Sequence, residues 1–112
     1  MPTRSVVEFL EEDGASPFAR WFLSLDAEAA ARVTAAVVRM ELGNLSNVKA
    51  LGQGVFERRI HWGSGYRIYF GQDGDCLILL LGGGTKKRQA RDIVAAKECW
   101  ARYKTRKKDQ RS

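Results

Sequence analysis

Three side chains that suit acid–base and charge-stabilising chemistry alternate along one short segment of the sequence. Glu57, Arg59 and His61 occupy every second position, so they lie on one face if the segment is a strand. Arg67 lies at a polar position of the alternating pattern in the next segment. The basic residues 86–88 follow a third segment. A cluster of cations around one acid and one imidazole suits a phosphodiester, whose transition state spreads negative charge over the nonbridging oxygens.

RNA is the substrate that this chemistry favours, because its 2′-hydroxyl can attack the adjacent phosphate without a metal. The sequence contains no acidic cluster suited to a metal, and we expect no metal and no cofactor. Arginine stays protonated, so Arg59 and Arg67 can only stabilise charge. A base must come from Glu57, His61 or a lysine beside other cations. The predicted catalytic residues are Glu57, Arg59, His61, Arg67, Lys86 and Lys87.

Each of these residues also has a purely structural interpretation. Glu57 and Arg59 can form a cross-strand ion-pair network, and His61 can be a partly exposed structural histidine beside Trp62. Arg58 falls on the apolar face of its segment. Either its stem lies across that face with the guanidinium at an edge, or the alternation is interrupted there.

The segments around these residues predict three consecutive antiparallel strands. Residues 55–62 and 66–70 alternate, and Gly63–Gly65 separates them. An Asp-Gly turn in 72–75 leads to a continuously apolar run, 76–81, which we expect to be central and buried on both faces. Gly82–Gly84 then predicts a sharp turn.

The remaining segments predict a small α+β domain over residues 1–112, with a sheet of about four antiparallel strands. An opening strand covers 5–10, two helices capped by Ser16 and Asp26 cover 17–25 and 27–42, and 44–54 is expected to be a loop. Thr85 is placed to cap a C-terminal helix over about 86–103, and the basic tail is expected to be loose from about 104. Cys76 and Cys99 lack metal-site spacing and are expected to be buried thiols.

Composition and charge fit a soluble protein that binds nucleic acid. The chain has 112 residues, 45% hydrophobic and 29% charged, with no apolar run of membrane-spanning length and no secretory leader, so we expect a cytoplasmic location. From Lys86 onward there are eleven lysines and arginines against three acids. Such a segregated basic block typically binds nucleic acid or an acidic partner, although a solvated helix face looks similar. The predicted RNA-binding residues are Arg58, Arg88, Arg91, Arg106, Lys107 and Lys108.

Several motifs resemble the RelE/ParE toxin superfamily, in its HigB-like addiction module killer protein (Gp49-like) branch. They are FERRI, GYRIYF, LLLGGGTKKRQ and DIVAAKECWARY, together with the EFL, SPFARWFLSLD and GNLSNVKALGQGVFE segments. The resemblance implies two N-terminal helices on one face of an antiparallel sheet. It places the family's glutamate–x–arginine motif on Glu57 and Arg59, its tyrosine–arginine pair on Arg67, and its paired basic residues on Lys86 and Lys87.

The same resemblance implies a function and partners. Ribosome-dependent members cut mRNA in the ribosomal A site and are neutralised by an antitoxin from the adjacent gene, which we expect to carry a helix-turn-helix domain. The middle residue of the strand motif is usually apolar in the family and is Arg58 here, so the residue that faces the substrate is either Arg58 or Arg59. Tyr103 is not assigned a site role. Two other activities stay open, a ParE-like topoisomerase inhibitor and an inactive co-regulator of the antitoxin.

Overall fold

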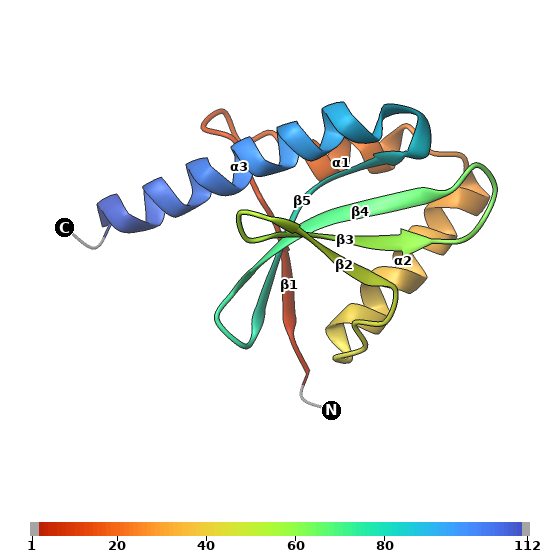
Figure 1. Cartoon of the computed structure of the whole chain (residues 1–112), viewed down its shortest axis with the longest axis horizontal. Helices are drawn as coiled ribbons and strands as arrows, with labels where there is room; N and C mark the ends of the chain where they lie inside the picture. Colours follow the sequence, from red (N-terminus) through yellow and green to blue (C-terminus); the bar gives the residue numbers. More distant parts are fainter. Residues whose placement is uncertain (1–2, 111–112) are drawn as a thin grey trace.

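Five strands form one mixed sheet in the order β1-β5-β4-β3-β2 (Figure 1). The computed structural model describes residues 3–110. The strand β1 runs parallel to β5, and every other neighbouring pair is antiparallel. The elements in chain order are β1 (Ser5–Glu8), α1 (Pro17–Leu23), α2 (Ala27–Glu41), β2 (Val48–Gly52), β3 (Val55–Ile60), β4 (Tyr66–Asp73), β5 (Leu77–Thr85), a 3-10 turn (Lys86–Arg88) and α3 (Gln89–Gln110).

Two cores lie on opposite faces of the sheet. On one face, Ile68, Phe70 and Leu80 pack against α1 and α2 through residues such as Val33 and Met40. The other face carries α3 over Val55, Tyr69, Leu79 and Leu81, which contact Ala96 and Trp100. The α+β fold with two N-terminal helices on one face is therefore confirmed, and β5 is buried on both faces although β4 is the middle strand.

The predicted loop 44–54 was wrong, because it contains the edge strand β2. Gln53 and Gly54 both have positive φ, 59° and 83°, and this geometry folds β2 back onto β3 as a tight hairpin. The segment Val48–Gly52 is largely exposed and lacks regular alternation, so its sequence carries little strand signal. Pairing with β3 supplies the stability that its composition does not.

The predicted turn at Gly82–Gly84 was also wrong, because these glycines continue β5. Gly83 and Gly84 are needed for close approach by helices on both faces: a Cβ on Gly83 would overlap the indole of Trp21, and one on Gly84 would overlap the carboxylate of Asp92. The chain turns only after Thr85, which precedes the 3-10 turn without a capping side-chain hydrogen bond.

The start of each N-terminal helix is confirmed by its cap. The Ser16 hydroxyl accepts a hydrogen bond from the Ala19 N–H at 3.0 Å, and the Asp26 carboxylate accepts one from the Ala29 N–H at 2.8 Å.

The predicted C-terminus of the last helix was wrong, because α3 continues to Gln110. Its distal half is held by side chains: Arg102 forms an ion pair with Glu11 at 3.0 Å, and the Tyr103 hydroxyl donates to Asp73. Of the two cysteines, Cys99 is buried as predicted. Cys76 is exposed, because it belongs to the turn before β5 rather than to the strand.

Candidate functional site

A buried carboxylate at the centre of β3 organises the cationic residues. Glu57 has no exposed surface, and its Oε2 atom lies 3.4 Å from Nε of Arg59 and 3.4 Å from Nε of Arg67. The sheet register sets Arg59 directly opposite Arg67, one pleat from Glu57. Gln89, at the start of α3, donates from Nε2 to Glu57 Oε1 at 3.3 Å.

This arrangement fixes two guanidinium groups while leaving their outer ends available. Both arginines use Nε toward Glu57, and among residues 3–110 neither uses a terminal nitrogen in a hydrogen bond. Arg67 is 5% exposed, whereas the Arg59 side chain is 46% exposed. Arg59 and Arg67 can therefore present terminal N–H donors to an anion while Glu57 holds their Nε atoms in place.

A hollow of about 430 Å³ opens where β3 and β4 are joined, and we name it the β3–β4 hollow. Glu57 lies beside it, under the two arginines. Lys87 and Arg88 are exposed on the 3-10 turn outside its lining. Four of the predicted catalytic residues line the hollow together with Ile60 and the connecting segment 62–66, and these four are Arg59, His61, Arg67 and Lys86.

Tyr69 lies beneath the arginines as a neutral phenol. Its hydroxyl is buried without a hydrogen-bond partner among the described residues. Burial, and next the charges of Asp92 and Glu57, raise the pKa of Tyr69 well above its usual range. Tyr69 therefore stays uncharged at neutral pH.

Arg58 lies on the opposite face of the sheet from Arg59, so the alternation of β3 is uninterrupted. It is only 4% exposed, and its Nη1 donates to the carbonyl oxygen of Asn44 at 3.2 Å. Burial lowers the pKa of Arg58, and the neighbouring charge of Arg39 lowers it further. Of the two arginines left open by the sequence, Arg59 shares the face of Glu57 and Arg67.

A second hollow, of about 500 Å³, lies between α2 and the end of β3 on the Arg58 face. We name it the α2 groove. Arg32 and Arg39 line it from α2, about two helical turns apart and therefore on one side of the helix. Neither arginine was among the predicted site residues, and their spacing on one helix face was the available signal.

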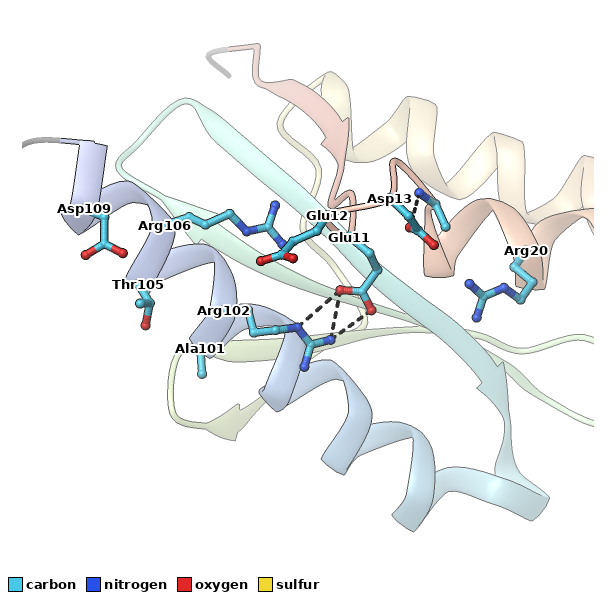
Figure 2. Close-up of a pocket in the computed structure, with 10 residues that line it drawn as sticks. Glu11, Glu12, Asp13, Arg20, Ala101, Arg102, Thr105, Arg106 and Asp109 are labelled. Carbon is cyan, nitrogen blue, oxygen red and sulfur yellow. Dashed lines mark hydrogen bonds and ion pairs between the residues drawn. The ribbon is translucent and has the colours of Figure 1, made fainter.

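The distal basic residues belong to a different region. Arg106 lines a larger hollow of about 910 Å³ between α3 and the acidic segment 11–13, and Figure 2 shows the Arg102–Glu11 pair in the same hollow. Arg106 Nη1 donates to the carbonyl oxygen of Leu10 at 2.7 Å, and Lys107 pairs with Asp73. Since α3 has 22 residues, it spans roughly 33 Å, which separates these cations from Lys86.

Arg88 and Arg91 lie near the start of α3, and Lys108 lies in its last turns. Gln89 is the site residue that sequence reasoning missed, since an amide at a strand-to-helix junction carries no distinctive pattern. Within residues 3–110, no three histidine, cysteine, aspartate or glutamate side chains are grouped to hold a metal ion. None of the helices in this part of the chain has an apolar stretch long enough to cross a membrane.

Comparison with known proteins gives two matches. The family model described as phage-derived protein Gp49-like (DUF891) matches residues 20–107, which include every predicted site residue except Lys108. An uncharacterized protein of Haemophilus influenzae is 38% identical over 81 residues, which cover 71% of this chain and 82% of the relative.

Proposed function

We propose, from the premise that this chain belongs to the phage-derived protein Gp49-like family, that it is the toxin of a type II toxin–antitoxin system and cuts mRNA on the ribosome. Family membership indicates a toxin-like protein, and the RelE/ParE resemblance supplies the finer activity. The observation that carries the proposal is the pair of guanidinium groups held by the buried Glu57 at the edge of the β3–β4 hollow.

In the proposed reaction, the 2′-oxygen of one nucleotide attacks the adjacent phosphorus. The P–O bond to the 5′-oxygen of the next nucleotide breaks, which gives a 2′,3′-cyclic phosphate and a 5′-hydroxyl. A base takes the 2′-hydroxyl proton, and an acid supplies a proton to the leaving 5′-oxygen. Arg59 and Arg67 stabilise the charge on the nonbridging oxygens.

The burial of Glu57 supports a positioning role for it. A carboxylate with no exposed surface and two arginine partners cannot reach a 2′-hydroxyl, so the base is sought among His61 and Lys86. His61 is exposed at the hollow, and imidazole is the side chain that most often acts as a general base in catalysis. We assign His61 as the proton acceptor and Lys86 as a further cation on the phosphate.

The proposed partners are mRNA in the ribosomal A site and an antitoxin with a helix-turn-helix domain encoded next to the toxin. The location that fits these partners is the cytoplasm. The antitoxin would suppress the activity by covering the cationic residues of the β3–β4 hollow, because a helix or extended segment with acidic side chains complements their charge.

Inducing the chain in cells and sequencing RNA 5′ ends tests the function. We expect growth arrest and new 5′-hydroxyl ends inside translated regions, which disappear when translation is blocked before induction. The control is Arg59→Gln, whose exposed side chain can change without disturbing the core. A DNA-damage response without RNA ends would instead identify a topoisomerase as the target, and normal growth would indicate an inactive co-regulator.

A further inference from the structure

The α2 groove contains a buried cation that has no counter-ion in the part of the chain that is described. Arg58 is 4% exposed and forms no ion pair with any of residues 3–110, and its Nε atom is buried without an acceptor. Its single hydrogen bond goes to the neutral carbonyl of Asn44. A buried guanidinium without an anion is costly, so this position is explained best by an anion that binds beside it.

Further cations surround the same groove. Arg39 is close enough for its charge to oppose that of Arg58, and Arg32 places its guanidinium carbon 5.2 Å from the centre of the Trp62 ring. Arg59 reaches the groove from the sheet. Glu28 is the one carboxylate in the lining, against four arginines, so the groove favours anions.

The groove adjoins the β3–β4 hollow. Four consecutive residues, Arg59 to Trp62, line both spaces, and the Trp62 ring is stacked on Tyr66 at 5.9 Å between centroids. A chain that carries one phosphate at Arg59 and Arg67 can therefore pass over this ridge into the groove. A polymer with regularly spaced phosphates matches two adjoining cationic sites.

We propose that the α2 groove binds a phosphate of the RNA strand that flanks the cleaved phosphodiester, held by Arg32, Arg39 and Arg58. This inference rests on the proposed function and adds the path of the substrate. RNA is favoured over an acidic protein segment because the groove adjoins the hollow where the reacting phosphate would lie. The exposed α2 arginines supply affinity, and the buried Arg58 supplies a fixed positive potential.

Binding of a short single-stranded RNA with 2′-O-methyl groups tests the inference without requiring cleavage. We would measure the dissociation constant by fluorescence anisotropy across a salt series for the wild type, Arg39→Gln and Arg32→Gln. The logarithm of the association constant falls as the logarithm of the salt concentration rises. Removing one phosphate-binding cation should make this negative slope shallower by roughly 0.7. The matched control is Arg20→Gln, which removes the same charge from an exposed position on α1 in the distant hollow of Figure 2.

The outcomes separate this inference from the proposed function. Slopes that become shallower for both α2 variants and not for Arg20→Gln support the inference. If the wild type cuts mRNA but the slopes of both α2 variants equal that of the wild type, RNA binding by the groove is refuted and the proposed function stands. If the wild type neither binds nor cuts RNA, both the inference and the proposed function are refuted. If polyglutamate binding, and not RNA binding, depended on Arg39, the groove would be a protein-docking surface and the inference would be wrong.

Discussion

Arg58 and Arg59 are consecutive in β3 and face opposite sides of the sheet. Arg59 shares a carboxylate with Arg67 and keeps a half-exposed side chain, whereas Arg58 is buried near Arg39. One strand therefore supplies a cation to each of two adjoining hollows. The two arginines consequently require different experiments, since one is compensated by Glu57 and the other is not.

The exposed member of the pair gives the cleanest test of catalysis. Arg59→Gln should reduce single-turnover mRNA cleavage on purified ribosomes by about a hundredfold, since removing one charge-stabilising group costs on the order of 3 kcal/mol in the transition state. The melting temperature should fall less than in a variant of Arg67, because the Arg59 side chain is 46% exposed and Arg67 still pairs with Glu57. A folded variant that cleaves at the wild-type rate would remove Arg59 from the site.

Arg67, the buried arginine that pairs with Glu57, should affect stability as well as activity. Removing Arg67 leaves Glu57 buried with one fewer partner, and breaking such a pair costs about 3–5 kcal/mol of unfolding free energy. We expect Arg67→Gln and Glu57→Gln to be strongly destabilising, and the double variant to lose less than the sum of the two. Urea denaturation of all four proteins measures this coupling, and additive losses would contradict it.

This coupling changes what the sequence alone indicated about Arg67. Strand alternation placed Arg67 correctly on the face of Glu57 and Arg59, because a two-residue period is local information. Alternation says nothing of what covers that face. Gln89 of α3 closes over Glu57, so the polar face is buried at Glu57 and Arg67, and a loss of activity in an Arg67 variant needs a stability control.

The features that the sequence did not predict depend on an unusual turn conformation or on contacts between distant residues. The hairpin of β2 depends on Gln53 and Gly54 adopting positive φ, and glutamine is not a usual residue for that turn. The helical end of α3 depends on Arg106 meeting Leu10, and the chain positions of these residues reveal no such contact. By contrast, helix caps at Ser16 and Asp26 are local, and they were predicted correctly.

Replacing Arg58 should affect stability and RNA binding in opposite directions. Arg58→Met replaces an uncompensated buried charge by an apolar side chain of similar length, so the free energy of unfolding should stay the same or rise by about 1 kcal/mol. Loss of the hydrogen bond to Asn44 offsets part of that gain. RNA affinity should fall. Urea denaturation with anisotropy on one preparation measures both; a loss of stability above about 2 kcal/mol would show that the charge is compensated.

Lys86 and Lys87 are a matched pair for testing whether a lysine must line the β3–β4 hollow to contribute to catalysis. Lys86 lines the β3–β4 hollow and Lys87 does not, although both are exposed on the 3-10 turn. Lys86→Gln should therefore lower the single-turnover rate by about tenfold or more, and Lys87→Gln should leave it within about twofold. Since both variants lose one charge, a general electrostatic effect would reduce both rates equally, and that result would contradict the assignment.

Tyr103 should make the stability of the chain fall at high pH. Burial, and then the hydrogen bond and charge of Asp73, raise the pKa of Tyr103 to about 12 from its ordinary value near 10. Below the lower value the phenol is protonated in both states, so its contribution is fully present. As pH rises from about 10 to about 12, the unfolded chain releases this proton while the folded chain retains it, and stability is lost.

Urea denaturation across this range compares the wild type with Tyr103→Phe. The variant should be less stable at neutral pH by about 1 kcal/mol, because it lacks the hydrogen bond to Asp73, and the difference should disappear toward pH 12. Tyr66→Phe is the control for loss of a phenol hydroxyl, since the Tyr66 hydroxyl donates no hydrogen bond within residues 3–110. A difference between wild type and Tyr103→Phe that stayed constant from about pH 8 to 12 would show that Asp73 does not hold the phenol in its protonated form.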